Sequence, residues 1–216
     1  MTWTLISASP SPYARKVRIA LQEKNLPFTL QTEVPWDTTT KTPQYNPLEK
    51  LPVLILDDGK TAIYESHYIM EWLEAKYPAT SLMPDDVDGK LFAKQVEVIT
   101  DGICDALVLA FFENKREEGK QSGPWKERQM RKADGGLQAL ATFVDQAGGG
   151  EFLIGNKLTL ADIAIASVLG WLSLRWPDHE WQRKHPQLKK YFDRLDQRES
   201  FANTRPAPQN ISDPVV

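Results

Sequence analysis

Cysteine is almost absent from this chain of 216 residues, with Cys104 as its one representative. A single thiol excludes an internal disulfide and any Cys-x-x-Cys redox or zinc motif. Histidine is scarce as well, and His67, His179 and His185 are not spaced as ligands on one helix face. Redox or metal chemistry would therefore have to come from a bound molecule, and we expect no metal site.

Long hydrophobic runs are also missing, because no stretch approaches the roughly 18 residues that a membrane helix needs. The opening residues, Met-Thr-Trp-Thr-Leu-Ile, lack the basic and apolar regions of a secretory signal. The net charge is only −3, and basic residues are scattered among acidic ones, unlike a surface that binds nucleic acid. We expect a cytoplasmic protein with neither membrane nor nucleic-acid partners.

The first 77 residues alternate strand and helix patterns. A strand, a helix and a second strand form a βαβ unit, which pairs its strands in parallel. Two further strands flank an Asp-Gly turn and form an antiparallel hairpin, after which a helix follows. These patterns predict a mixed four-stranded sheet. The predicted strands are 3–6, 27–34, 51–56 and 61–64, and the predicted helices are 11–25 and 66–76.

The rest of the chain has no convincing strand pattern. A stretch without periodicity suits a linker at 79–87, between a first domain of residues 1–78 and a second domain of residues 88–216. Helical periodicity in the second domain predicts a bundle, with the most apolar helix at its buried centre. The paired glycines Gly135 and Gly136 indicate close packing or a kink. The predicted helices are 89–118, 125–147, 160–171 and one around 188–195.

The start of the first helix is a candidate site for a thiolate. Ser11 is suited to the N-cap, and Pro12 to the first helical position, where its missing N–H is not needed. The Ser11 hydroxyl would then lie at the positive end of the helix. Ser9 also precedes a proline and competes for this role, but Ser11 is nearer the helix. A capped surface helix without function is the alternative interpretation of Ser11.

Four separated motifs together resemble the glutathione S-transferases, of the serine type. They are Ser11 at a helix start, Lys50-Leu51-Pro52-Val53 entering the hairpin, Tyr64-Glu65-Ser66 leaving it, and Thr159–Ala164, read as Thr-Leu-Ala-Asp-Ile-Ala. The resemblance covers nearly the whole chain. It implies a thioredoxin-like N-terminal domain with a mixed four-stranded sheet, followed by a helical-bundle C-terminal domain.

The resemblance also implies which residues bind glutathione as co-substrate. Pro52 would be a cis-proline, and the Leu51 backbone would pair with the cysteinyl part of glutathione. Ser66 and the start of its helix would receive the γ-glutamyl carboxylate, Glu65 the ammonium group, and Lys50 the glycyl carboxylate. Taken alone, each of these residues has an ordinary structural interpretation. Pro52 would open a strand, Ser66 would cap a helix beside a solvated Glu65, and Lys50 would be a solvated loop residue.

Ser11 is the catalytic candidate because it matches the hydroxyl-Pro-aromatic pattern of the family. Relatives with cysteine at this position form mixed disulfides, which serine cannot. The resemblance therefore implies that glutathione thiolate attacks a small hydrophobic electrophile, or reduces a peroxide, in detoxification. The alternatives are a non-catalytic glutathione- or ligand-binding protein, and a pathway-specific glutathione-dependent dehalogenase, etherase or isomerase.

The family further implies a homodimer and an electrophile site between the domains. Tyr68, Met70 and the helix from Leu91 to Asp105 are candidates for the dimer contact, and Asp101 is a candidate to face the partner's ligand. The electrophile would lie near Pro12, Trp36 and the apolar helix that carries Leu109, Phe111 and Phe112.

Overall fold

The computed structural model describes residues 2–214, which fall into two compact units. Unit 1 comprises residues 2–82 together with Arg198–Pro214, and unit 2 comprises Met83–Gln197. The sequence-based division placed all of 88–216 in one helical domain. The contacts of the chain instead group Arg198–Pro214 with the sheet of unit 1.

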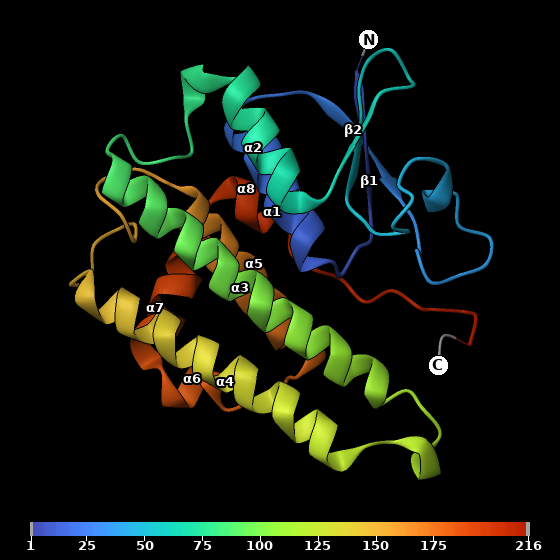
Figure 1. The fold of residues 1–216 in the computed structure, drawn as a ribbon. Coiled ribbons are helices and arrows are strands. Elements are labelled where there is room, and N and C mark those ends of the chain that lie inside the picture. The colour runs from blue at the N-terminus through green and yellow to red at the C-terminus, as the bar shows by residue number, and fades with distance from the viewer. Residues whose placement is uncertain (1, 215–216) are drawn as a thin grey trace. The chain divides into compact units, whose positions relative to one another are not determined.

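Unit 1 is built on a four-stranded sheet (Figure 1). Its strands are β1 (Trp3–Ser7), β2 (Phe28–Thr32), β3 (Val53–Ile55) and β4 (Ala62–Tyr64). They lie in the order β2-β1-β3-β4, with β1 parallel to β2 and both other pairs antiparallel. A βαβ unit followed by a hairpin produces this order, so the predicted mixed sheet is confirmed.

The two longer helices of unit 1 cover one face of this sheet (Figure 1). Leu5, Leu54 and Ile63 are in register and buried, and successive strand residues point to opposite faces. Ile6 and Val53 therefore belong to the other face, where Tyr45 and Leu51 are among the residues that pack against them. The helices of unit 1 are α1 (Pro12–Glu23), α2 (Ser66–Lys76) and α8 (Glu199–Ala202), with 3₁₀ turns at Thr42–Gln44 and Pro78–Thr80.

The β3–β4 hairpin turns at Asp58 and Gly59, as predicted. Gly59 has a positive φ of 68°, which a residue without Cβ adopts at little cost. The Asp58 carboxylate accepts hydrogen bonds from the Thr61 hydroxyl, Thr61 N–H and Lys60 N–H. These bonds lower the pKa of Asp58 to about 2.

Two basic side chains of α1 are buried, although helical periodicity places them largely off the apolar face of this helix. Arg15 and Lys16 are only 1% and 2% exposed. Arg15 Nη2 donates to the carbonyl of Phe201 in α8 at 3.1 Å. The C-terminal segment thus covers a side of α1 that local periodicity assigned to solvent.

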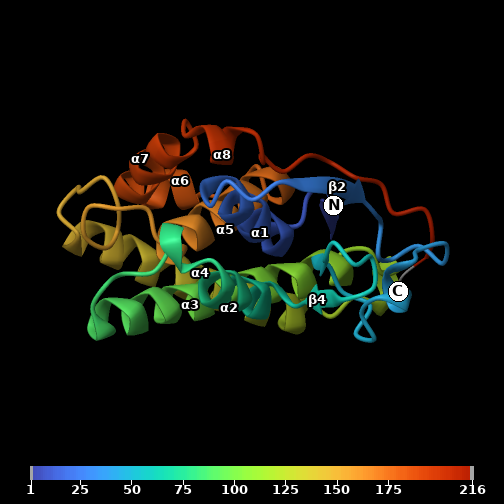
Figure 2. The same ribbon diagram turned by 90° about the horizontal axis from the view of Figure 1, so that it is seen from above.

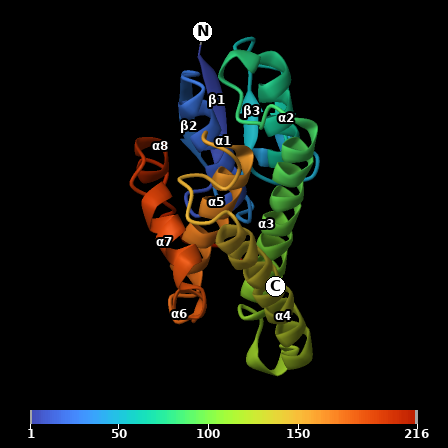
Figure 3. The same ribbon diagram turned by 90° about the vertical axis from the view of Figure 1, so that its left-hand side faces the viewer.

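Unit 2 is entirely helical over the residues that the structure describes, and Figure 3 shows α5 beside α7. Every residue from Leu160 to Leu172 in α5 is buried, which confirms α5 as the centre of the bundle. No helix in 2–214 is both long enough and apolar enough to pass through a membrane. The helices are α3 (Val87–Glu113), α4 (Gly123–Gln146), α5 (Leu160–Arg175), α6 (Trp181–Lys184) and α7 (Pro186–Leu195), with a 3₁₀ turn at Glu118–Lys120.

Of the paired glycines in α4, one marks close packing, and the helix is continuous through both. A Cβ at Gly136 would lie 2.4 Å from Ile103 Cγ1 and 2.8 Å from Ile103 Cδ1 on α3. A Cβ at Gly135 would meet no atom within 4 Å. Gly136 therefore lets α4 approach α3, whereas Gly135 has no packing role.

Alanine substitutions at these two glycines should have opposite effects on stability. Gly136→Ala should lower the free energy of unfolding by about 1–3 kcal/mol, since Ile103 must move. Gly135→Ala should raise it by about 0.5–1 kcal/mol through helix propensity alone. Urea denaturation of both variants measures the difference, and stabilisation by both would contradict the close approach of α4 to α3.

Candidate functional site

Strand register brings the predicted site segments of unit 1 to one edge of the sheet. Ile6 near the end of β1 pairs with Val53 at the start of β3, and Val53 pairs with Tyr64 at the end of β4. The chain therefore leaves β1 toward Ser11, enters β3 from Leu51-Pro52, and leaves β4 into Glu65-Ser66, all at this edge. Residues that the sequence separates by more than 50 positions thus share one location.

Ser11 is the N-cap of α1, as predicted. Its Oγ accepts a hydrogen bond from Ala14 N–H at 3.2 Å, and Pro12 occupies the first helical position. The hydroxyl keeps its own hydrogen as a donor toward a ligand. The first turn of α1 carries no acidic residue, so the positive end of the helix dipole is not neutralised there. This environment favours an anion that accepts from Ser11.

Ser9 lies in the turn before Ser11 and is held through its backbone. Its N–H donates to Gln209 Oε1 at 3.2 Å, and its carbonyl accepts from Ala207 N–H at 3.4 Å. Ser11 N–H closes the turn by donating to the Ala8 carbonyl at 3.0 Å. The helix cap therefore belongs to Ser11, which supports the preference for Ser11 over Ser9.

The Leu51-Pro52 peptide bond is cis, as the family resemblance implied. Pro52 is buried, and Leu51 lies beyond the paired part of β3, so its N–H and C=O are outside the strand ladder. The preceding Lys50 has an exposed side chain, and its carbonyl accepts from Asn46 Nδ2 at 2.8 Å. Buried Asn46 thus fixes the backbone that leads into Leu51.

The start of α2 differs from the simplest expectation, in which Ser66 caps the helix. Glu65 is the N-cap, and its carboxylate accepts from His67 N–H and Tyr68 N–H, both at 3.3 Å. Ser66 is the first helical residue and is buried, and its hydroxyl lies 3.5 Å from Glu65 Oε1. The exposed Glu65 and buried Ser66 are adjacent, as the predicted headgroup site requires.

The backbone of Glu65 is strained. Its φ of 74° and ψ of 120° lie in a sparsely populated region of backbone conformation, which costs a residue with a side chain roughly 1–3 kcal/mol. Such outliers concentrate at functional sites, where the surrounding structure holds them. Glutamate is not a residue that predicts a positive φ, so the sequence contained no signal for this feature.

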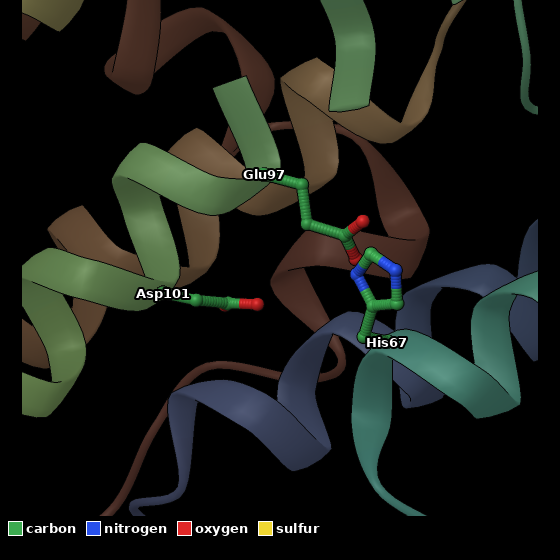
Figure 4. Close-up of side chains that lie close together, drawn as sticks. All are labelled: His67, Glu97 and Asp101. Carbon is green, nitrogen blue, oxygen red and sulfur yellow. The ribbon is translucent and has the colours of Figure 1, made fainter. Parts of the chain in front are cut away.

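Figure 4 shows the side chains of His67, Glu97 and Asp101. His67 lies on α2 in unit 1, with Nε2 3.2 Å from Glu71 Oε1. Glu97 and Asp101 lie one turn apart on α3 in unit 2, where buried Glu97 accepts from Lys94 Nζ at 3.2 Å. Lys94 therefore compensates the buried charge of Glu97, and the role suggested for Asp101 toward a partner's ligand stays a prediction.

The residues suggested for a dimer contact separate into two groups. Tyr68 on α2 is 53% exposed, and Leu91 and Val98 on α3 are each 64% exposed. Met70, in contrast, is only 2% exposed. Met70 was therefore a wrong candidate for a surface contact, because its side chain is buried.

The aromatic residues suggested for the electrophile site lie at the end of α3 in unit 2. Phe111 and Phe112 are half-buried, with ring centroids 5.2 Å apart. Two cations face the Phe111 ring, Arg175 at 4.7 Å and Lys115 at 5.3 Å from its centroid. In unit 1, Trp36 is 47% exposed. No local pattern in the sequence indicates that Arg175 lies against Phe111.

Two family models match the chain. A glutathione S-transferase N-terminal domain model matches residues 10–76, and a glutathione S-transferase C-terminal domain model matches residues 123–194. Among curated proteins, the chain is 33% identical over 202 residues to an uncharacterized GST-like protein, YibF, of Escherichia coli K12. That match covers 94% of this chain and 98% of the relative.

Solved structures agree with this assignment. A glutathione S-transferase of Methylobacterium radiotolerans, in complex with glutathione sulfonate, is 52% identical with a TM-score of 0.95 over 100% of both chains. A glutathione S-transferase of Methylobacillus flagellatus, with GSH bound, is 33% identical with a TM-score of 0.88, over 95% of this chain and 100% of that one. By fold, family models and full-length similarity, the chain belongs to the glutathione S-transferase family.

Proposed function

We propose that this chain is a glutathione transferase that joins the glutathione thiolate to small hydrophobic electrophiles in detoxification. One observation carries the proposal: the Ser11 cap, the Leu51-Pro52 segment and the Glu65-Ser66 helix start meet at one sheet edge. Glutathione or glutathione sulfonate bound to the solved relatives supports the choice of co-substrate.

The ends of glutathione match the groups at this edge. The Glu65 carboxylate accepts from His67 N–H and Tyr68 N–H, and the Ser66 hydroxyl lies 3.5 Å from it. The Ser66 N–H, and the Ser66 hydroxyl after it turns away from Glu65, would donate to the γ-glutamyl carboxylate. The ammonium group of the same headgroup would pair with Glu65. The cysteinyl backbone would pair with Leu51, and exposed Lys50 would approach the glycyl carboxylate.

Ser11 would then stabilise the sulfur as a thiolate. A thiol of pKa about 8.5 is only a few per cent ionised at pH 7, and lowering that pKa by two units requires about 2.7 kcal/mol. A hydrogen bond to a charged group contributes about 1.5–3 kcal/mol, and a helix N-terminus about 0.3–1 kcal/mol. The two together suffice without a general base. The thiolate attacks the electrophilic carbon, forms the S–C bond and expels the leaving group with its electron pair.

The headgroup site is tested by calorimetry of glutathione binding. We expect Glu65→Gln to weaken binding by about 10- to 100-fold, because it removes the charge that pairs with the ammonium group and keeps an acceptor for the helix cap. Glu71→Gln, on an exposed turn of the same helix, is the matched control and should bind glutathione normally. Equal affinities of the two variants would place the headgroup elsewhere.

Turnover separates the transferase from a glutathione carrier. Initial rates with a panel of electrophiles should show conjugation by the wild type. A protein that is retained on immobilised glutathione but conjugates none of the electrophiles would be a carrier instead. A single halogenated, ether or isomerisable substrate with a far higher rate than the rest would point to a dedicated pathway enzyme.

We further infer a homodimer, as expected from the family. Leu91 and Val98 lie seven positions apart on one face of α3, and both have exposed apolar side chains, which supports this inference. Tyr68 on α2 is exposed as well. The cytoplasmic location expected from the sequence stays a prediction.

A further inference from the structure

The C-terminal segment of the chain returns to the turn that carries Ser11. Figure 2 shows this segment, in red, passing β2 toward the loop that follows it. Its contacts with the turn are the two backbone bonds of Ser9, one to Gln209 Oε1 and one to Ala207 N–H. Residues about 200 positions apart are therefore directly bonded at the start of the candidate site.

The Gln209 side chain joins the ends of two neighbouring strands. Its Oε1 accepts from Ser9 N–H just beyond β1, and its Nε2 donates to the Glu33 carbonyl just beyond β2 at 3.1 Å. Glu33 N–H in turn donates to the Ser7 carbonyl at 2.9 Å, which continues the β1–β2 ladder. The half-buried amide thus extends the sheet at the point where the chain turns toward α1.

The segment is anchored on both sides of Gln209. Before it, Arg198 forms two hydrogen bonds with the Glu23 carboxylate, at 2.6 and 2.7 Å. After it, Asp213 accepts from Thr38 N–H at 2.5 Å and from the Thr38 hydroxyl at 2.7 Å. These anchors on both sides of Gln209 restrain its backbone, and this restraint supports the hydrogen bond from Ser9 N–H to the Gln209 side chain.

The turn transmits this restraint to the Ser11 hydroxyl. Only Pro10 separates Ser9 from Ser11, and Pro10 is buried with a φ fixed by its ring. The Ala8 carbonyl holds Ser11 N–H from the other side of the turn. Moving Ser9 would therefore move the oxygen that caps α1.

We propose that Gln209 is a positioning residue that, through Ser9, holds the Ser11 hydroxyl in the orientation that stabilises a thiolate. The inference rests on the proposed function of Ser11 and extends it to a residue outside the headgroup and thiol sites. Gln209 itself contacts only backbone groups of Ser9 and Glu33 in the described hydrogen bonds.

The test compares Gln209→Met with wild type, because methionine keeps the volume of the side chain and loses both hydrogen bonds. Gln138→Met, at an exposed position of α4, is the matched control. Amide hydrogen exchange of the ligand-free protein reports on the turn. We expect Ser9 N–H to exchange about two- to tenfold faster in Gln209→Met, the factor that corresponds to one lost hydrogen bond.

The second measurement is the pKa of bound glutathione, followed by thiolate absorbance against pH. Gln209→Met should raise it by about half a unit, which means about threefold less thiolate below the pKa. The conjugation rate should fall by a similar factor near neutral pH and recover above about pH 9, where the thiol ionises unaided. A loss of general stability would lower the rate at every pH.

Ser11→Ala in the same series separates the two hypotheses. If Ser11→Ala raises the thiol pKa and Gln209→Met does not, the positioning role is overturned while the proposed function stands. Unchanged exchange at Ser9 in Gln209→Met overturns it as well. If Ser11→Ala leaves the thiol pKa unchanged, the proposed role of Ser11 fails, and the positioning role fails with it.

Discussion

Replacing Ser11 with alanine should raise the pKa of bound glutathione by about one to two units. The hydroxyl is the group at this edge that can donate to sulfur from the cap of α1, and such a bond to an anion contributes about 1.5–3 kcal/mol. At neutral pH the thiolate fraction, and with it the conjugation rate, should fall by about 10- to 100-fold. The helix N-terminus remains, so the thiol pKa should not rise fully to that of free glutathione.

The same substitution also removes a helix cap, which by itself costs about 1 kcal/mol of stability. Ser122→Ala is the matched control, because Ser122 caps α4 by accepting from Trp125 N–H at 3.3 Å. It should lower stability without changing the thiol pKa. Ser11→Thr should keep both the cap and the donor, and Ser9→Ala should keep both as well. An unchanged pH profile in Ser11→Ala would remove serine from the mechanism.

Local signals were sufficient to predict the elements on which the site is built. Ser11 and Pro12 follow the preferences of a helix start, and the Asp58-Gly59 pair follows those of a hairpin turn. The burial of α5 at the centre of the helical bundle was predictable from its continuous apolar sequence. In each case a short stretch of sequence determines its own structure, so no knowledge of distant residues was needed.

The juxtaposition of the site residues was not readable from any local pattern. Strand register places Leu51 and Glu65 beside the turn before α1, and register depends on pairing across the whole sheet. The family resemblance supplied this step. It also supplied the cis bond before Pro52, which occurs in only about 5–6% of such bonds.

The C-terminal segment, Arg198–Pro214, groups with unit 1, whereas the sequence-based division placed it in the second domain. Its residues carry few apolar side chains in a periodic pattern, so their bonding to unit 1 left no trace in the sequence. Arg15 shows the same effect. A cation at this spacing predicts a solvated helix face, yet the Arg15 side chain is buried and donates to the Phe201 carbonyl. Because the C-terminal segment has no such pattern, the sequence could not indicate that Gln209 lies beside the candidate site.

The largest loss of stability should follow from Asp162→Ala at the start of α5. The Asp162 carboxylate is buried and accepts from Thr159 N–H at 2.7 Å, from the Thr159 hydroxyl at 2.8 Å and from Leu153 N–H at 2.8 Å. The hydroxyl of Tyr191 on α7 donates to the same carboxylate. Burial raises the pKa of Asp162, and the hydrogen bonds from Tyr191, Leu153 and Thr159 oppose that rise.

Alanine would leave these donors buried without an acceptor, at about 1–3 kcal/mol for each that water does not reach. We expect a total loss of about 3–5 kcal/mol in the free energy of unfolding, measured by urea denaturation with circular dichroism. Asp85→Ala removes an exposed carboxylate paired with Lys157 at 2.6 Å and should have little effect on stability, because solvent screens exposed ion pairs. Tyr191→Phe removes one donor and no acceptor, so its cost should fall between the two. If Asp162→Ala costs no more than Asp85→Ala, the carboxylate is not what joins the start of α5 to Leu153 and α7.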